Sequence, residues 1–288
     1  MRIAVLVTVH NRVAVTVNGL SRLADLSKLL AGEFQFRVFL VDDGSTDGTG
    51  ERVREVPLDL TQIRGTGSLY WNRGMAWAYR AARDSGDRFD AYMLYNDDVV
   101  LDNNFIEFMR QFKDDSTNIL VGAFREPGSD EISYSGFVRV RRLRPFAFIN
   151  PELDQRLVPV DTFNGNVVLV PSRAFEALGG LDPKYTHAYG DLDLGLRAKD
   201  IGVSSFVFGV PIGSCERGSS LAERVAVADI RTRWKLLFGF PHGPRSYLRF
   251  VRKHGITAFF PLYAVGEIAR RARQLLPRSS SQDANSGL

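Results

Sequence analysis

The chain has 288 residues, of which 44% are hydrophobic and 24% charged, enough apolar material for one large domain or for a domain with an appendage. Its single cysteine, Cys215, excludes an internal disulfide framework and fits a reducing compartment. Four histidines (His10, His187, His242 and His254) without short metal-type spacing argue against a structural zinc site. No stretch reaches the roughly 18–20 uninterrupted apolar residues of a spanning helix, and the first apolar run is too short for a signal peptide.

The formal net charge of +4 is mild, but it is unevenly distributed. Basic side chains gather in the last quarter, where Asp229 and Glu267 are nearly the only early acidic residues. The basic residues are Arg231, Arg233, Lys235, Arg245, Arg249, Arg252, Lys253, Arg270, Arg271, Arg273 and Arg278. Such a surface could meet nucleic acid, anionic lipid or a phosphorylated substrate.

Two buried strands separated by a helix are predicted at the start of the chain. The apolar, β-branched run Ile3–Val9 is typical of a strand buried on both faces, and Phe36–Val41 is a second such run. Between them, apolar residues keep helical spacing from Val13 to Leu30. Strand, helix and strand at this spacing predict a βαβ unit and therefore a parallel sheet with a right-handed crossover.

Helices and strands continue to alternate along the middle of the chain. We expect a loop over residues 61–72, a helix over Arg73–Arg83 and a strand over Ala91–Tyr95. Further expected elements are helices over 104–112, 171–179 and 192–199, strands over 119–124, 167–170 and 203–210, and short strands over 132–140 and 146–149. From about Val225 we expect basic helical segments broken by prolines, and a disordered tail from Arg278.

Carboxylates occur at three places around this predicted sheet. Asp42-Asp43 ends the second strand and Asp97-Asp98 follows Ala91–Tyr95, so both pairs should face the edge where open α/β sheets bind ligands. The third place is Gly190-Asp191-Leu192-Asp193, at a helix start. Adjacent aspartates suit a hard divalent cation. An Asp-rich turn, a helix cap or an i,i+4 contact between Asp193 and Arg197 would explain each place without any function.

The spaced glycines of Gly44–Gly50 could suggest a dinucleotide-binding turn. They follow the second strand rather than the first, and no Tyr-x-x-x-Lys pair lies downstream, so we discount a short-chain dehydrogenase. No Lys-Ser or Lys-Thr follows them, which excludes a phosphate-binding Walker loop.

Six motifs follow one another in a fixed order along the chain. They are Thr8-Val9-His10-Asn11-Arg12, Val41-Asp42-Asp43-Gly44-Ser45-Thr46-Asp47-Gly48, Asn96-Asp97-Asp98, Gly165-Asn166, Gly179-Gly180-Leu181-Asp182 and Gly190-Asp191-Leu192-Asp193-Leu194. Through this ordered set, about residues 1–220 resemble the inverting, sugar-nucleotide-dependent glycosyltransferases of family 2. The loop Gly67–Met75 and the stretch His187–Asp193 look most similar to the bacterial, rhamnosyltransferase-like branch.

The resemblance implies an α/β protein of the GT-A fold, with a single Rossmann-like, mostly parallel sheet flanked by helices and a C-terminal helical appendage. We expect a catalytic domain over residues 1–224, a basic helical region over 225–277 and a disordered tail over 278–288. The implied localisation is cytoplasmic. The basic region could bind anionic lipid at the inner face of the membrane, or it could be a helical appendage packed on the domain with its arginines in water.

The resemblance also implies roles for the matching residues. Asp191 would be the general base, and Asp98 would ligate Mg²⁺ or Mn²⁺ bridging the diphosphate of a UDP- or dTDP-linked sugar donor. The donor would be held by Thr8, His10, Arg12, Asp43, Trp71, Arg73 and Asp97. A glycan or lipid-linked acceptor would meet Asn164, Asn166, His187 and Asp193. Transfer to its hydroxyl would invert the anomeric centre.

Three positions depart from the wider family. Asn96 stands where an Asp-x-Asp triplet often begins, Gly190 stands where many members have Glu, and Cys215 stands near a late His. The first two substitutions leave open a catalytically impaired sugar-nucleotide-binding protein. A sugar nucleotidyltransferase is a further alternative, but His10-Asn11-Arg12-Val13 is not the glycine-rich loop that would hold a triphosphate. Nucleic acid is disfavoured as a partner, because the predicted crevice is acidic.

Overall fold

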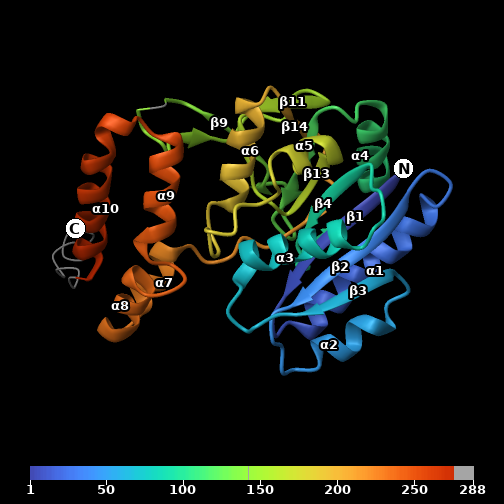
Figure 1. Cartoon of the computed structure of the whole chain (residues 1–288), viewed down its shortest axis with the longest axis horizontal. Coiled ribbons are helices and arrows are strands. Elements are labelled where there is room, and N and C mark those ends of the chain that lie inside the picture. Colours follow the sequence, from blue (N-terminus) through green and yellow to red (C-terminus); the bar gives the residue numbers. More distant parts are fainter. Residues whose placement is uncertain (142, 276–288) are drawn as a thin grey trace, which may run out of the picture. The chain divides into compact units, whose positions relative to one another are not determined.

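The computed structural model describes residues 1–141 and 143–275, which fall into two compact units, Met1–Arg217 and a second unit beginning at Gly218. An eight-stranded sheet forms the centre of the first unit, in the order β11-β14-β6-β13-β4-β1-β2-β3 (Figure 1). Its strands are β1 Arg2–Val9, β2 Gln35–Asp42, β3 Asp59–Arg64, β4 Ala91–Tyr95, β6 Ile119–Val121, β11 Leu157–Val160, β13 Val167–Pro171 and β14 Ser205–Phe208.

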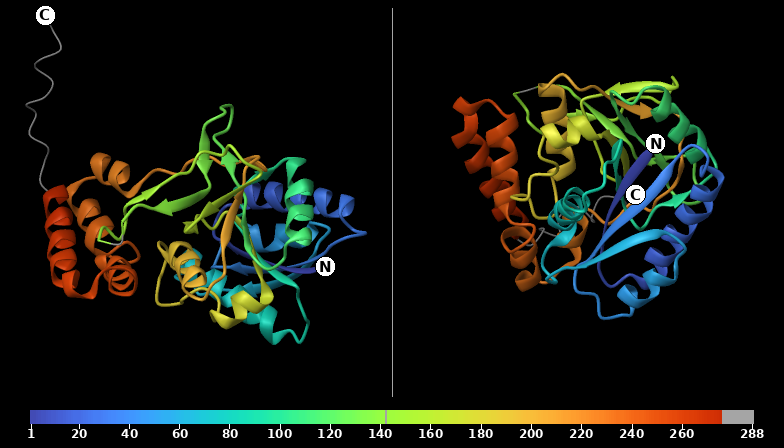
Figure 2. Two further views of the ribbon diagram at one scale, coloured as in Figure 1. Left: turned by 90° about the horizontal axis from the view of Figure 1, so that it is seen from above. Right: turned by 45° about the vertical axis from the view of Figure 1, so that its right-hand side comes forward.

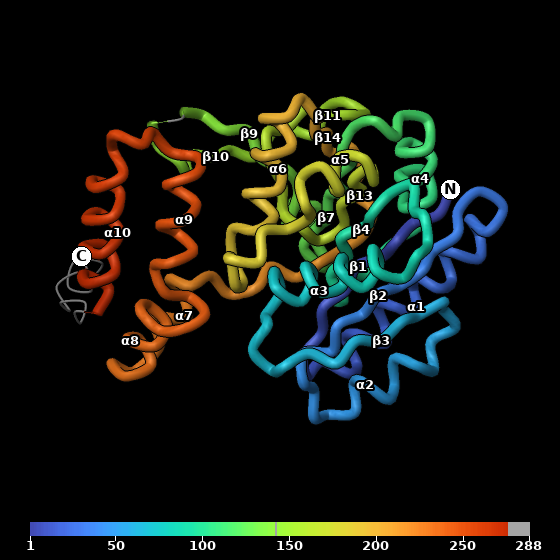
Figure 3. The backbone as a smooth tube through the Cα atoms, viewed as in Figure 1, coloured from blue at the N-terminus to red at the C-terminus, as the bar shows by residue number. Residues whose placement is uncertain are grey.

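The sheet has a parallel half and a mixed half. Strands β3, β2, β1 and β4 run parallel, as the βαβ pattern predicts. Strand β13 is antiparallel to both β4 and β6, between which it lies. Figure 3 shows β13 beside β4. Beyond it, β14 is parallel to β6 and antiparallel to the edge strand β11. The mixed half is built from segments that come late in the chain.

The register of the parallel half brings three strand ends to one level. Leu6 of β1 is aligned with Phe39 of β2 and with Leu94 of β4. The residues four positions later are His10, Asp43 and Asp98, so they emerge together at the carboxyl edge. The edge expected to bind ligands is thus assembled by strands whose side chains are buried on both faces.

Helices cover both faces of the large sheet, as the two views of Figure 2 show. On one face, α1 (Val13–Leu29) and α4 (Asn104–Asp114) contribute Leu20, Leu23, Phe105 and Phe108 to a core shared with alternate strand residues. On the other, α3 (Tyr70–Asp84), α5 (Ser172–Ala177) and α6 (Gly190–Asp200) form a second core. A short helix α2 (Thr49–Arg52) and a 3-10 turn over Val53–Glu55 precede β3.

Two small sheets accompany the large one. The first has the order β10-β9-β12, with β9 Gly136–Arg139, β10 Phe148–Ile149 and β12 Thr162–Phe163. The second has the order β5-β15-β7-β8, with β5 Val100–Leu101, β15 Gly213–Ser214, β7 Phe124–Arg125 and β8 Ile132–Tyr134. Together they organise most of residues 126–160, where the sequence indicates only short strands.

The second unit is helical in its described part. It contains α7 Leu221–Val227, α8 Ile230–Phe238, α9 Pro244–His254, a 3-10 turn over Thr257–Phe259 and α10 Phe260–Leu275. Ser220 and Glu223 form a reciprocal capping box on α7, and the Asp229 carboxylate accepts backbone N–H bonds at the start of α8. Inside the unit the Arg271 guanidinium donates to Glu267 and to the carbonyls of Leu237 and His242.

The element boundaries differ from the sequence prediction mainly between residues 59 and 73. Strand β3 continues to Arg64, and α3 begins at Tyr70 rather than Arg73. Asp43 explains the early helix start, because its carboxylate accepts N–H bonds from Leu69 and Tyr70. The helix breaks expected near the late prolines are confirmed. The tail predicted to be disordered, residues 278–288, lies outside the described residues.

Candidate active site

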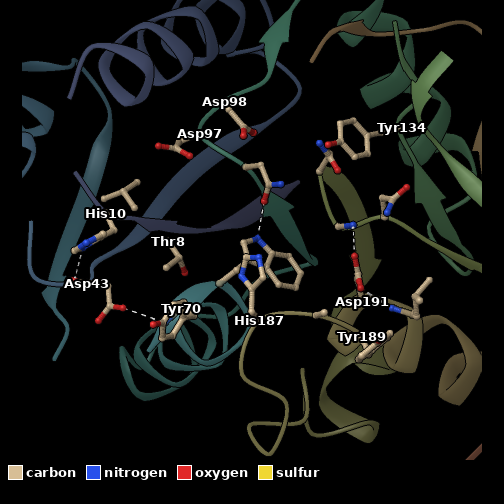
Figure 4. A pocket seen from close by; sticks show the side chains of 18 of the residues that line it. Thr8, His10, Asp43, Tyr70, Asp97, Asp98, Tyr134, His187, Tyr189 and Asp191 are labelled. Carbon is tan, nitrogen blue, oxygen red and sulfur yellow. Dashed lines mark hydrogen bonds between the residues drawn. The ribbon is translucent and has the colours of Figure 1, made fainter. Parts of the chain in front are cut away.

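A cavity of about 610 Å³ lies at the carboxyl edge of β1, β2 and β4 in the first unit. Figure 4 shows Asp97 and Asp98 on one side of it and Asp191, next to Tyr189, on the other. Of the residues predicted to form the site, those lining the cavity are Thr8, His10, Arg12, Asp43, Trp71, Asp97, Asp98, Asn164, Asn166, His187 and Asp191. The structure therefore gathers into one place groups up to 183 positions apart in the sequence.

Asp43 organises the loop that leads into α3. Its Oδ1 accepts from the N–H of Gly67 at 2.8 Å, and its Oδ2 accepts from the N–H groups of Leu69 and Tyr70 at 2.8 and 2.9 Å. A carboxylate has about four lone-pair sites, so one acceptor position remains for a ligand. The Asp43 carbonyl accepts from His10 Nδ1 at 2.8 Å, so His10 Nε2 is an acceptor, and it takes a hydrogen bond from Asn11 Nδ2 at 3.2 Å.

Arg12 bridges the two aspartates that follow β4. Its guanidinium donates to Asp97 Oδ1 at 3.4 Å and to Asp98 Oδ2 at 3.0 Å. Asp97 is only 3% exposed and also accepts from the Thr16 hydroxyl of α1, while burial raises the pKa of its carboxyl group. Asp98 is more exposed than Asp97 and faces the cavity. The two neighbours are therefore not equivalent: Asp97 is anchored, and Asp98 is accessible.

Asn96, which stands where an Asp-x-Asp triplet often begins, lines the cavity and bonds to Trp71 and Asn166. Its Oδ1 accepts from Trp71 Nε1 at 2.6 Å, and its backbone N–H donates to the Asn166 carbonyl at 2.8 Å. The Trp71 ring lies so close to Gly165 that a Cβ there would be 2.6 Å from it. An aspartate in place of Asn96 could also accept from the indole, so the amide changes the charge here and keeps this contact.

Asp191 lies in the first turn of α6, on the opposite side of the cavity. Its Oδ1 accepts from the N–H of Leu192 at 2.8 Å, and its Oδ2 accepts from the N–H of Gly165 at 3.0 Å. Burial raises the pKa of the carboxyl group, and these backbone donors oppose that rise without cancelling it. A carboxylate with a raised pKa suits proton transfer near neutral pH.

Gly190 is required by a close approach of α3. A Cβ at this position would lie 1.6 Å from Asn72 Oδ1. Asn72 is fully buried, and its Nδ2 donates to the carbonyls of Asp182 and Tyr185, each at 2.8 Å. Its side chain therefore occupies the space that a larger residue before Asp191 would need. The sequence shows the glycine but contains no signal that pairs it with Asn72.

Two residues predicted to contact substrates lie elsewhere. Arg73 is on α3 but is not among the residues that line the cavity. The Asp193 carboxylate is fully buried and accepts from Arg197 Nε at 2.6 Å and from the Tyr185 hydroxyl at 3.1 Å. The i,i+4 contact with Arg197 explains Asp193 without any substrate, so we leave both residues out of the proposed site.

The cavity also contains residues that the sequence analysis did not assign to it. They are Tyr134, Phe137, Phe148 and Tyr189. The aromatic residues come from β8, β9, β10 and the turn before α6. Their signal in the sequence was only the aromatic content of an irregular segment, which does not specify a cavity.

The donor set fits a divalent cation only in part. Within residues 1–141 and 143–275, no group of three His, Cys, Asp or Glu side chains could hold a metal ion. Asp98 offers one accessible carboxylate, and Cys215 Sγ lies 3.8 Å from its Oδ1. Mainly burial raises the Cys215 pKa to about 12, so this side chain is a neutral thiol. The residues therefore fit Mg²⁺ or Mn²⁺ shared with substrate phosphates and waters, which such ions accept.

Several solved structures share the fold of this chain. A mannosyltransferase from Pyrobaculum calidifontis, in complex with GDP-Man and Mn²⁺, matches with a TM-score of 0.54 and 16% identity over 94% of this chain and 75% of its own. S. aureus TarS 1–349 matches with a TM-score of 0.58 and 12% identity, over 96% of this chain and 89% of its own. Glucosyl-3-phosphoglycerate synthase from Mycobacterium tuberculosis, in complex with phosphoglyceric acid, matches with a TM-score of 0.51 and 13% identity, over 88% of this chain and 80% of its own.

These likenesses confirm the α/β architecture of the GT-A fold that the motifs predict. A search of curated proteins found no significant match. The model of glycosyl transferase family 2 matches residues 4–171, which include β1, the Asp43 loop, Asn96-Asp97-Asp98 and Gly165. That match covers more than half of the chain and contains most of the cavity. The chain therefore belongs to glycosyl transferase family 2 and is a glycosyltransferase.

Proposed function

We propose that this enzyme transfers a sugar from a nucleoside-diphosphate sugar to a hydroxyl acceptor, with inversion of the anomeric centre. The observation that carries the proposal is that one cavity has Asp98 on one side and, on the other, a half-buried Asp191 whose pKa is raised by burial. Transfer of a hexosyl or deoxyhexosyl group, as in the rhamnosyltransferase-like enzymes that the motifs resemble, is part of the proposal. The acceptor would be a glycan or lipid-linked glycan.

The donor would bind along the ends of β1 and β2. The remaining acceptor position of Asp43 would take a base N–H, such as that of the uracil or thymine of a UDP- or dTDP-linked sugar. The Thr8 hydroxyl supports a polar ligand here, because its oxygen is buried at the cavity wall and has no hydrogen-bond partner in the described part of the chain. His10 and Arg12 would contact the nucleotide beside it.

The diphosphate would lie near Asp98. Asp98 would hold Mg²⁺ or Mn²⁺ together with the phosphate oxygens, and such an ion neutralises charge that develops on a phosphate leaving group. Asp97 is already bonded to Thr16 and Arg12, so we assign it to positioning Arg12 beside the donor. Trp71, fixed by Asn96, would form the floor under the donor sugar.

The acceptor would enter from the side of Asp191, with Asn164, Asn166 and His187 around it. The proton of its hydroxyl would pass to an Asp191 carboxylate oxygen as the hydroxyl oxygen bonds to the anomeric carbon. The bond from that carbon to the diphosphate breaks in the same step, and the nucleoside diphosphate leaves with the electron pair. Attack opposite the leaving group, with one base and no covalent sugar intermediate, gives inversion.

The substitution Asp191→Asn tests the assignment of the base. We expect loss of transfer with donor affinity close to wild type, because the base acts on the acceptor and not on the nucleotide. Asp200→Asn, at the exposed other end of α6, is the matched control and should leave transfer unchanged. Turnover by Asp191→Asn at the wild-type rate would rule out Asp191 as the base.

A thermal-shift panel of nucleoside diphosphates and sugar nucleotides, with and without Mn²⁺, would identify the donor. The Asp98→Ala variant should lose the part of the donor affinity that depends on Mn²⁺, and Asp114→Ala on α4 should retain it. Unchanged donor and Mn²⁺ affinities for Asp98→Ala in calorimetry would overturn the metal assignment. A protein that binds donors but neither transfers nor hydrolyses them would instead be the catalytically impaired binding protein.

The second unit is proposed to bind an anionic membrane surface, placing the enzyme at the inner face of the cytoplasmic membrane. Residues 218–275 carry eleven Lys and Arg against three Asp and Glu, whereas residues 1–217 have an excess of acidic residues. Exposed apolar side chains lie on its helices, with Leu262 67%, Val265 69% and Trp234 58% accessible. No helix in the described part of the chain is long and apolar enough to cross a membrane.

Sedimentation with lipid vesicles tests this surface. The double variant Leu262→Ser/Val265→Ser should bind vesicles containing anionic lipid less than wild type, while Leu29→Ser, an equally exposed leucine of α1, should bind normally. Wild-type protein that fails to sediment with anionic vesicles at low salt would remove the membrane from the proposal. We also propose that the catalytic domain comprises residues 1–224, and a protein truncated after residue 224 would test this boundary.

A further inference from the structure

An aromatic surface borders the side of the cavity that holds Asp191. It consists of Tyr134, Phe137, Phe148 and Tyr189, all partly exposed and all lining the cavity. Figure 4 shows Tyr189 beside Asp191, with Tyr134 on the same side of the cavity. Because water solvates aromatic rings poorly, four partly exposed rings in one concave place indicate a binding surface.

The register of the small sheet β10-β9-β12 fixes where two of these rings point. Phe148 is aligned with Arg139, and Phe137 lies two residues before Arg139 on the same strand, so both phenylalanines project from one face. Their ring centroids are 6.1 Å apart. Thr162 is aligned with Phe137 and therefore projects from that face too.

The same face is tied directly to the helix of the proposed base. Thr162 Oγ1 donates to the Leu192 carbonyl of α6 at 2.9 Å. Three residues after Thr162, the N–H of Gly165 donates to Asp191 Oδ2 at 3.0 Å. Phe137 and Phe148 are therefore carried on a sheet that contacts Leu192, the residue after Asp191, and that is followed within two residues by the Gly165 N–H bonded to Asp191. A molecule on these rings would lie next to the carboxylate.

The charge of this half of the cavity indicates what kind of molecule it accepts. Among the described residues that line the cavity, Arg12 is the sole lysine or arginine, and it is bonded to Asp97 and Asp98 on the donor side. Arg139 is aligned with Phe148 and projects from the same face, but it does not line the cavity. A phosphate or carboxylate brought to Asp191 would therefore meet a carboxylate, with no lysine or arginine among the described residues that line this half of the cavity.

Polar groups accompany the rings and distinguish a sugar from a purely apolar chain. The amides of Asn164 and Asn166 line the cavity beside Asp191. A pyranose ring has an apolar C–H face that can lie on an aromatic ring and an equatorial rim of hydroxyls that need hydrogen-bond partners. An isoprenoid chain would offer no donor to the acceptor positions of Asp191 that the N–H groups of Leu192 and Gly165 leave open, and covering a polar group without a partner is costly.

We propose that this aromatic surface binds an uncharged sugar ring of the acceptor, stacked on Phe137 and Phe148, and presents one of its hydroxyls to Asp191. This inference rests on the proposed function and narrows it. The acceptor end is a neutral saccharide, and acids and phosphorylated acceptors are disfavoured at the reacting ring. Phe137 and Phe148 set this specificity by contacting the acceptor, and the donor half of the cavity does not depend on them.

Saturation-transfer NMR tests the inference with the full chain, a nucleoside diphosphate and Mn²⁺ present. The ligands are the methyl glycosides of rhamnose, glucose, galactose, mannose and N-acetylglucosamine, with glucose 6-phosphate, glucuronic acid and farnesol as competitors. We expect at least one neutral glycoside to bind through its ring C–H protons. Replacing each phenylalanine by leucine should weaken that binding about threefold to tenfold, the range expected for a lost ring contact.

The variants Phe137→Leu and Phe148→Leu keep apolar bulk, so folding and donor binding should persist. Phe206→Leu on β14, outside this cavity, is the matched control and should bind glycosides as wild type does. The inference is overturned if no neutral glycoside binds, if the charged sugars or farnesol bind in preference, or if both leucine variants bind like wild type. Failure of the wild-type protein to bind any sugar nucleotide would instead overturn the proposed function itself.

Discussion

Replacing Gly190 by alanine is the most direct test of how α3 positions the start of α6. The added Cβ would lie 1.6 Å from Asn72 Oδ1 and 2.5 Å from Asn72 Cγ, far inside contact distance. Asn72 cannot swing aside freely, because its Nδ2 donates two buried hydrogen bonds of 2.8 Å to the carbonyls of Asp182 and Tyr185. Either the helix start moves or both hydrogen bonds break.

The two routes differ in cost. Overpacking a dense interior costs about 1–3 kcal/mol, whereas two buried carbonyls left unpaired cost about 1–3 kcal/mol each. The chain takes the less costly route, so we expect Gly190→Ala to lower the free energy of unfolding by about 1–3 kcal/mol, out of the roughly 5–15 kcal/mol of a typical domain. Transfer should fall as well, because the first turn of α6 carries Asp191.

A double-mutant cycle separates this clash from general damage. Asn72→Ala alone should be destabilising, since it leaves the same two carbonyls unpaired. In the Asn72→Ala background, however, Gly190→Ala should cost little, so that the coupling energy is about 2 kcal/mol. Urea unfolding followed by far-ultraviolet circular dichroism measures each corner, and Gly32→Ala, where no atom lies within 4 Å of an added Cβ, is the control. Additive effects within about 0.5 kcal/mol would refute the reasoning.

Two further predictions concern the reaction. Transfer should be lost as the pH falls through the pKa of Asp191, which burial raises, with a midpoint above the ordinary range of an aspartate, because the base must be ionised; a midpoint within or below that ordinary range in the pH profile of kcat would contradict it. The pKa of Asp191 is higher in the folded chain than in the unfolded chain, so ionisation of this carboxyl group lowers the free energy of unfolding. That loss of stability should disappear as the pH falls and the group becomes protonated in both states. Trp71→Phe should leave Asn96 Oδ1 without its indole donor, cost about 1 kcal/mol and raise the donor KM. Trp77→Phe on the same helix but outside the cavity should leave the KM unchanged, and equal effects from the two variants would count against a role for Trp71.

The parts of the fold that the sequence predicts well are those whose signal is local. Ile3–Val9 and Phe36–Val41 are continuous apolar runs, and a helix between them leaves a parallel pair as the natural arrangement. Strand Val167–Pro171 has an equally clear apolar signal, but its residue types do not show whether it runs parallel or antiparallel to its neighbours. It pairs antiparallel with β4 because the chain returns through the small sheets of residues 124–163, whose strands are mostly two to four residues long. Such short strands give too few residues for a period to be recognised.

The sequence predicted which carboxylates meet at the candidate site, but not the contacts that each of them makes there. The carboxylates lie at strand and helix ends, and the parallel register brings them together, so residue type and position were enough to gather them. The contacts that decide what each one does were not available from the sequence. Thr16 lies 81 residues from Asp97, and Asn72 lies 118 residues from Gly190, with no pattern in either segment to connect them. Long-range packing of this kind determines which of two neighbouring aspartates remains accessible.

The Asn72–Gly190 contact also bears on how the proposed base acquires its properties. In relatives with an acidic residue at this position, a second carboxylate would stand beside the base, and like charges raise each other's pKa. Here Asn72 fills that space, and the pKa of Asp191 is raised by burial against the opposing N–H groups of Leu192 and Gly165. The departure at Gly190 therefore does not by itself indicate an inactive protein. A base whose pKa is raised by burial depends instead on the exclusion of water from the cavity. The aromatic rings beside Asp191, once covered by an acceptor sugar, would exclude water from it.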